Sequence, residues 1–186
     1  MALKATIYKV TLGIADMDRG VYAEQPVTIA RHPSETDERM MLRLLALGLH
    51  RPAHDDDGAL EFAKGLWDPD EPELWRKDLT GRIMHWIDVG QPDDKRLLRA
   101  CGRADRVTVL SYSHSTPIWW AATAGKVART TNLEVWQVLP EQSQALAALA
   151  QRSMQLQLSV QDGTAWVSET AGAVEITPVR LYPAST

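Results

Sequence analysis

Apolar and polar residues alternate along two neighbouring segments near the start of the chain, residues 3–14 and 21–32. A two-residue period is typical of β-strands with one buried face, and the stretch ADMDRG between the segments has turn chemistry. The pattern therefore predicts an N-terminal β-hairpin. Residues 154–160, 164–169 and 173–181 have the same strand character, with a turn at QDGT between the first two. These segments predict a closing β-meander.

A helical period is clearest in residues 32–49, where an inward stripe at spacings of three and four is formed by Glu38, Met41, Leu42, Leu45 and Leu49. Ser34 is the predicted N-cap of this helix. Further helices are predicted at residues 92–104, 115–129 and 141–152, and further strands at residues 59–66, 81–90, 105–113 and 133–139. Residues 68–78 predict a loop with one helical turn. The mixed order favours an α+β fold, with a mixed β-sheet flanked by helices.

Composition places the chain among ordinary globular proteins. It has 186 residues, 45% of them hydrophobic and 24% charged, which predicts a single domain over residues 1–186. The net charge of −4 gives no global attraction to nucleic acid, so such binding requires a local basic patch. Cys101 is the one cysteine, which excludes an intramolecular disulfide. The N-terminal segment lacks a signal peptide's apolar core, and no apolar window suits a membrane span, so a cytoplasmic location is expected.

Asp88 ends a segment, residues 83–89, that is apolar on both faces and therefore predicts a central strand. A carboxylate at this position is costly to bury unless a helix N-terminus, an arginine or a metal ion stabilises it. Asp78 lies ten residues earlier. If the two acids meet, a Mg²⁺ ion relieves their repulsion; the alternative is that Asp78 caps a surface turn and Asp88 pairs with an arginine.

Two charged groups on predicted helices add candidate chemistry. Glu38 points toward the core side of its helix, either as a third acid beside Asp78 and Asp88 or as a first-turn acid stabilised by the helix dipole. Lys95, Arg99 and Arg103 recur at every fourth position of the helix after Asp88, with Arg96 beside them. This basic stripe indicates either a surface for a phosphate backbone or a solvated helix face.

The segments MALKATIYK, ARHPSETDERMMLRLLA, DEPELW, WIDVGQPDD, IWW and LEVWQV resemble the bacterial YaeQ family, in the same order and over nearly the whole chain. Members resemble in fold a compact variant of the PD-(D/E)XK superfamily, which includes type II restriction endonucleases. The resemblance implies a restriction-endonuclease-like αβββαβ core, here with an N-terminal β-hairpin and C-terminal strands. In that superfamily, an Asp and a second acid hold Mg²⁺, and a Lys follows the second acid by two residues.

Under this resemblance, Asp78 corresponds to the first acid, Asp88 to the second, and Glu38 to an acid on the first core helix. The chain departs from the pattern at Gly90, which occupies the position of the Lys. Three lysines are candidates to replace it: Lys64, Lys77 and Lys95.

Two functions follow from these residues. One is a metal-dependent nuclease, in which Asp78 and Asp88 bind Mg²⁺, Glu38 assists and a lysine such as Lys64 positions the attacking water. The other, motivated by Gly90 and the net acidity, is a non-catalytic nucleic-acid-binding or regulatory protein on a nuclease-like scaffold. In both, the basic stripe of Lys95, Arg96, Arg99 and Arg103 contacts nucleic acid.

Overall fold

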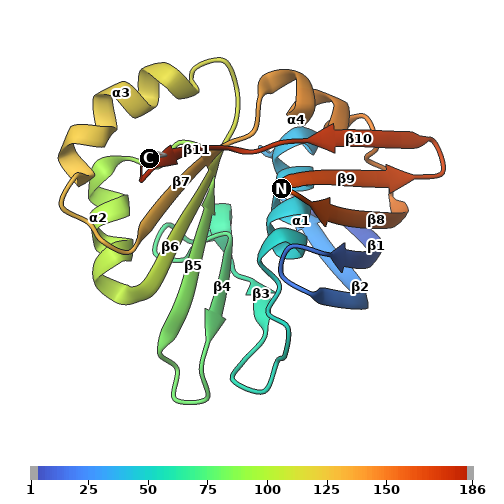
Figure 1. Ribbon diagram of the computed structural model, residues 1–186, viewed down its shortest axis with the longest axis horizontal. Coiled ribbons are helices and arrows are strands. Elements are labelled where there is room, and N and C mark those ends of the chain that lie inside the picture. Colours follow the sequence, from blue (N-terminus) through green and yellow to red (C-terminus); the bar gives the residue numbers. More distant parts are fainter. Residues whose placement is uncertain (1–3, 184–186) are drawn as a thin grey trace. The chain divides into compact units, whose positions relative to one another are not determined.

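The computed structural model describes residues 4–183 and contains helices and strands in an α+β arrangement with two mixed β-sheets (Figure 1). The chain forms two compact units, each assembled from separate stretches of sequence. The first unit comprises residues 4–53 and 141–177. The second comprises residues 54–140 and 178–183.

The first unit is built on a five-stranded sheet in the order β10-β9-β8-β1-β2. Its strands are β1 (Thr6–Asp16), β2 (Val21–Arg31), β8 (Ser153–Gln161), β9 (Thr164–Glu169) and β10 (Gly172–Ile176), and its helices are α1 (Asp37–His50) and α4 (Pro140–Ala147). β1 and β2 pair antiparallel, which confirms the predicted hairpin. β8 and β9 are joined through Asp162 and Gly163, both with positive φ, as a tight hairpin turn requires.

One face of this sheet packs on α1. Leu12, Leu156 and Leu158 point inward and line a common apolar interior with Met41 and Leu44 of the helix. The alternation along each strand sends the neighbouring residues to the opposite face of the sheet. That opposite face carries polar side chains together with the exposed rings of Tyr22 and Trp166.

The N-terminus of α1 differs from the prediction. Thr36, not Ser34, is the N-cap, and its hydroxyl accepts a hydrogen bond from the Arg39 backbone N–H at 3.2 Å. The Ser34 hydroxyl instead lies 2.6 Å from His32 Nδ1. The chain makes a turn before the helix, in which Glu35 N donates to the His32 carbonyl. This turn leaves Ser34 outside the position from which a hydroxyl reaches the first helical N–H groups.

The second unit contains a six-stranded sheet in the order β11-β7-β6-β5-β4-β3. Its elements are β3 (Leu60–Phe62), the 3₁₀ turn η1 (Gly65–Trp67), β4 (Leu74–Lys77), β5 (Ile83–Val89), α2 (Asp94–Arg103), β6 (Ala104–Ser111), α3 (Thr116–Val127), β7 (Leu133–Gln137) and β11 (Val179–Tyr182). β5, β6 and β7 are parallel, and β5 lies between β4 and β6, as its two apolar faces predict. Trp86, Val107 and Val135 of the sheet form one core with Leu97 of α2 and Val127 of α3.

Two predictions, one for a loop with a helical turn and one for a strand, were wrong. Residues 68–78 contain no helical turn; the turn lies earlier, in η1, and Leu74 is buried in β4 between two antiparallel neighbours. The stretch 173–181 is not one strand, because Pro178 has no N–H for a sheet ladder. The chain divides there into β10 and β11, which belong to different sheets.

Candidate functional site

Asp88 lies at the end of β5 with only 3% of its surface exposed, and it is bound by an arginine. Arg96 Nε donates to Asp88 Oδ2 and Arg96 Nη2 to Asp88 Oδ1, each at 2.9 Å. Asp93, the N-cap of α2, accepts from the Arg96 backbone N–H at 2.7 Å and so fixes the first turn of the helix. The result is a bidentate ion pair, the strongest geometry available to this pair of groups.

The remaining N–H groups of Arg96 hold the loop that precedes β4. Nη1 donates to the Pro69 carbonyl at 2.6 Å, and Nη2 also donates to the Glu71 carbonyl at 2.9 Å. The guanidinium carbon lies 5.8 Å from the centre of the Trp86 ring. Arg96 therefore joins the end of β5, the helix α2 and the loop in one hydrogen-bonded cluster, and it covers both oxygens of Asp88.

Asp78 lies at the other end of β5. Its carboxylate Oδ1 accepts hydrogen bonds from Thr80 N at 2.8 Å, Thr80 Oγ1 at 2.6 Å and Arg82 N at 3.0 Å, closing the turn between β4 and β5. The hydrogen bond from the Thr80 side chain lowers the pKa of the Asp78 carboxyl. This is the arrangement of a turn-capping aspartate.

The antiparallel register separates Asp78 from Asp88. Lys77 pairs with Ile83, whereas Leu74 pairs with Ile87, so the chain leaves β4 beside the start of β5. Six residues of extended strand span about 20 Å between the position beside Asp78 and Asp88. The structure therefore does not bring together the two acids that the resemblance assigns to one Mg²⁺ ion.

The acid whose position lies opposite Asp88 is Glu73, which was not among the acids predicted from the sequence. It precedes β4, its N–H donates to the Ile87 carbonyl at 3.1 Å, and it is 5% exposed. Its carboxylate lies against the backbone of Gly65, where a Cβ atom would stand 2.3 Å from Glu73 Oε2. A signal existed in the sequence: Glu73 follows a proline in DEPELW, one of the segments on which the family resemblance rests.

Glu38 belongs to the first unit, where its Oε1 accepts a hydrogen bond from the buried Ser143 hydroxyl at 2.5 Å. Another acid of that unit, Glu35, is buried and bound by Arg39 at 2.9 Å and by Arg43 at 2.6 Å. These contacts join α1 to its surroundings within the first unit.

The candidate lysines occupy three different settings. Lys64 is exposed after β3, with Nζ 3.6 Å from Asp68 and 3.7 Å from Glu71. Lys77 Nζ lies 3.5 Å from the centre of the Trp75 ring, and Lys95 is exposed on α2. Gly90 itself has φ of +113°, a conformation that a lysine adopts only with strain. Of the three lysines, Lys64 lies nearest to Glu73 along the sheet. It follows β3, and the N–H of its neighbour Ala63 donates to the Glu73 carbonyl.

Arg99 and Arg103, in the basic stripe, contact the loop that Arg96 holds. Arg99 Nη1 donates to Asp70 Oδ1 at 3.0 Å, and Arg103 Nη1 donates to the Asp70 carbonyl at 3.0 Å. The Arg99 and Asp70 side chains are 57% and 73% exposed, so water and salt screen this pair strongly. The stripe is therefore a basic helix surface whose outer charges are only weakly neutralised.

A buried histidine lies further back on β5. His85 Nε2 is 2.8 Å from the Thr108 hydroxyl, and both residues are buried. Burial, followed by the charges of Arg106 and Arg76, lowers the pKa of His85 to about 3. His85 is therefore neutral at physiological pH and acts as a hydrogen-bonding core residue.

The donor set does not fit a resident metal ion in this conformation. Both oxygens of Asp88 bind Arg96, and residues 4–183 contain no group of three or more His, Cys, Asp or Glu side chains placed to hold an ion. No helix within the described residues is long and apolar enough to cross a membrane.

Comparison with known proteins gives a consistent result. The family described as YaeQ protein matches residues 1–178. YaeQ of Escherichia coli (strain K12) and YaeQ of Salmonella typhi are each 44% identical over 178 residues, covering 95% of this chain and 95% of the relative.

The solved structures that match nearly the whole chain include two YaeQ proteins. The crystal structure of the YaeQ protein from Xanthomonas axonopodis pv. citri has a TM-score of 0.89 and 44% identity, covering 95% of this chain and 98% of that one. The crystal structure of YaeQ from Pseudomonas syringae has a TM-score of 0.89 and 36% identity, covering 97% of each chain. The chain, which resembles this family already in its sequence segments, belongs to the YaeQ protein family.

Proposed function

We propose that this protein is a non-catalytic nucleic-acid-binding protein on a scaffold related to the PD-(D/E)XK nucleases. The elements α1, β3, β4, β5, α2 and β6 follow one another in the αβββαβ order of that superfamily, which supports the placement. The observation that carries the proposal is the bidentate Asp88–Arg96 pair. The Arg96 guanidinium binds both oxygens of Asp88, the carboxylate that a catalytic metal ion requires as a ligand.

The binding surface in this proposal is the outer face of α2. Lys95, Arg99 and Arg103 are exposed there, while Arg96 stays in its structural cluster. Arginine and lysine contacts to phosphates depend little on base sequence and respond strongly to salt. The protein therefore binds the sugar–phosphate backbone of the nucleic acid, and its overall net charge of −4 keeps the affinity moderate.

The test is fluorescence anisotropy of labelled duplex DNA and single-stranded RNA at several salt concentrations. Replacing Lys95, Arg99 and Arg103 together by Ala removes three phosphate contacts, so the slope of log K against log salt flattens by about 2 to 3. The matched control is the triple variant Lys4→Ala, Lys9→Ala and Arg129→Ala, which removes the same charge from exposed positions elsewhere. Equal binding by the two triple variants would refute the proposed surface.

A second variant tests the same surface by a predicted increase in affinity for nucleic acid. Asp70→Ala removes the exposed carboxylate that binds Arg99. Because such a surface pair is worth only about 0.2 to 1 kcal/mol, we expect affinity for nucleic acid to rise by a factor of about 1.5 to 5. Weaker binding by Asp70→Ala would mean that the loop, and not the basic helix, contacts the ligand.

A metal-dependent nuclease is the second candidate function, and the register of β4 and β5 favours it. Glu73 and Asp88 are both buried and occupy opposed positions at one end of β4 and β5. Lys64 follows β3, the strand on the other side of β4. This function requires Arg96 to leave Asp88 so that Mg²⁺ can bind.

Its test is cleavage of mixed DNA and RNA substrates with Mg²⁺ or Mn²⁺. Wild-type protein is compared with Glu73→Gln, Asp88→Asn and Lys64→Ala, with Asp78→Asn as the matched acid control. Metal-dependent cleavage that disappears in Glu73→Gln and Asp88→Asn, and persists in Asp78→Asn, would establish the nuclease and overturn the non-catalytic proposal.

A further inference from the structure

The outward face of the sheet in the first unit carries two rows of side chains of distinct chemistry. Gly13 of β1 is paired with Glu24 on one side and with Gln157 on the other, and Gln157 is paired with Ser168. These four residues form a polar row across β2, β1, β8 and β9. In β1 and β8 the residues that flank the row, Leu12, Ile14, Leu156 and Leu158, are buried in the core, so the row belongs to the solvent face of the sheet.

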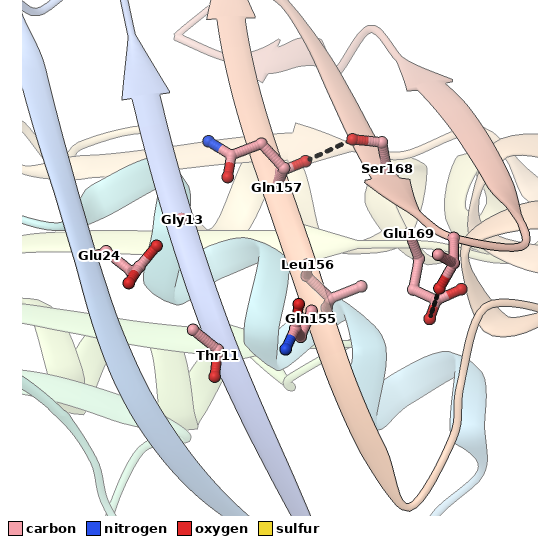
Figure 2. Close-up of a pocket in the computed structure, with 9 residues that line it drawn as sticks. Thr11, Gly13, Glu24, Gln155, Leu156, Gln157, Ser168 and Glu169 are labelled. Carbon is pink, nitrogen blue, oxygen red and sulfur yellow. Dashed lines mark hydrogen bonds between the residues drawn. The ribbon is translucent and has the colours of Figure 1, made fainter.

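A hollow of about 290 Å³ lies over this row (Figure 2). Thr11, Gln155 and Glu169 add to its lining. Gly13 forms part of the floor: a Cβ atom there would stand 2.1 Å from Gln157 Oε1, so the missing side chain is what lets the glutamine amide lie across β1. Figure 2 shows the side chains of Glu24, Gln157 and Thr11 arranged around this position.

An aromatic row runs beside the polar row. Tyr22 pairs with Ala15, Ala15 with Ser159, and Ser159 with Trp166. Tyr22 is 67% exposed and Trp166 is 37% exposed. Three strand spacings separate the two rings by about 14 Å, and only the small side chains of Ala15 and Ser159 lie between them. Two solvent-exposed rings thus border a strip of small side chains next to a hydrogen-bonding hollow.

The polar groups of the hollow combine donors and acceptors. The amides of Gln155 and Gln157 and the hydroxyl of Thr11 can each do both, whereas the carboxylate of Glu24 accepts only. The Ser168 hydroxyl donates to the Gln157 carbonyl at 3.4 Å (Figure 2) and keeps its capacity to accept. The Glu169 carboxylate already accepts from Thr170 Oγ1 and Ala171 N, each at 2.8 Å.

This chemistry selects among ligands. A cation needs acceptors alone and leaves the amide N–H groups of the hollow without a role. A phosphate is repelled by Glu24, and neither row contains Lys or Arg. Hydroxyl groups both donate and accept, and the apolar C–H faces of sugar rings pack on exposed indole and phenol rings.

We propose that this face binds a neutral oligosaccharide, with one sugar ring packed on Trp166 and the hydroxyl groups of the chain hydrogen-bonded in the hollow lined by Gln157 and Glu24. The strip between Tyr22 and Trp166 is long enough for a short run of sugar units. This site lies in the first unit and is independent of the nucleic-acid surface proposed on α2.

The experiment is titration of the full chain with neutral hexasaccharides: cellohexaose, maltohexaose, laminarihexaose and N-acetylated chitohexaose. Calorimetry measures affinity, and the indole N–H resonance of Trp166, assigned by its loss in Trp166→Phe, reports contact. We expect at least one hexasaccharide to bind and to shift that resonance. Trp166→Ala weakens its binding by a factor of about 3 to 10, and Trp166→Phe by less.

Matched variants identify the contact surface. Gln157→Ala truncates an exposed side chain of the hollow and also weakens binding, while Trp67→Ala removes an exposed tryptophan of the second unit and leaves binding unchanged. Circular dichroism confirms that each variant is folded. The proposal is overturned if no hexasaccharide binds at millimolar concentration, if Trp166→Ala and Gln157→Ala bind as well as wild type, or if oligouridylate or oligolysine shifts the Trp166 resonance where no sugar does.

Discussion

Replacing Arg96 by methionine tests the central structural assignment, that Asp88 is neutralised by an arginine and not by a metal ion. Methionine keeps much of the length and apolar surface of the side chain but removes every hydrogen bond from the guanidinium. Asp88 remains almost completely buried and loses both donors to its carboxylate oxygens. The carbonyls of Pro69 and Glu71 lose their donors as well.

The expected cost follows from burial. Removing one member of a buried ion pair destabilises a protein by about 3 to 5 kcal/mol, because the other charge stays buried without a counterion. The Asp88 side chain is 4% exposed and that of Arg96 is 25% exposed, so water screens the pair little. We expect Arg96→Met to lower the free energy of unfolding by about 3 kcal/mol, and Asp88→Asn by about 2, since Arg96 then keeps its two carbonyl acceptors.

Urea unfolding of wild type, both single variants and the double variant provides the assay. The double variant should lose less stability than the sum of the single losses, by about 1.5 to 3 kcal/mol, because the two residues form one network. Each measurement is repeated with millimolar Mg²⁺. A metal ion present at about 100 times its Kd would add about 2.7 kcal/mol to the stability of a protein that binds it.

Two results would contradict the assignment. Additive losses in the double variant would mean that Asp88 and Arg96 do not stabilise one another. An increase in wild-type stability with Mg²⁺, abolished by Asp88→Asn, would mean that the ion displaces Arg96. Stabilisation by Mg²⁺ of Arg96→Met alone would show that the arginine is what excludes the ion from Asp88.

Three further predictions concern stability. His85 has a pKa of about 3 in the folded state and near 6.5 in the unfolded state, so between these values only the unfolded state takes up the proton. The free energy of unfolding therefore falls as pH drops through this range, by up to about 5 kcal/mol. Urea unfolding at several pH values should show a smaller fall for His85→Gln than for wild type. Gly48→Ala in α1 places a Cβ atom 2.4 Å from Leu158 Cδ2 and should lower the melting temperature. Gly102→Ala in α2 places its Cβ atom in open space and should raise the melting temperature. Equal shifts of the melting temperature in the two variants would refute the packing argument. Gly163→Ala in the β8–β9 turn, at φ of +75°, should cost about 1 kcal/mol in urea unfolding, and a neutral result would mean that the turn tolerates a side chain.

The periodic parts of the fold were predictable because periodicity is a local property. Alternation gave the β1–β2 hairpin and the β8–β9 hairpin, and the central position of β5 followed from its two apolar faces. The same logic failed at β4, whose four residues are too few to show a period. Its pairing with β3 and β5, and not its sequence, makes it a strand.

The family was also within reach of the sequence. Long segments resembled YaeQ proteins, and the comparisons confirm that membership. Recognition of a family assigns residues to positions only where the motif is unambiguous. Spacing along the chain and the family resemblance both pointed to Asp78 as the acid near Asp88, whereas the register of β4 and β5 places Glu73 there.

The sequence alone determined that Asp88 ends a buried strand and therefore needs a compensating group. Only the tertiary structure decided which group this is, because spacing along a chain fixes where a side chain points from its own element but not which element lies beside it. The register of β4 against β5 placed Glu73 opposite Asp88 and sent Asp78 to the far end. The return of α2 along the sheet brought Arg96, predicted as part of a phosphate-binding stripe, onto the carboxylate.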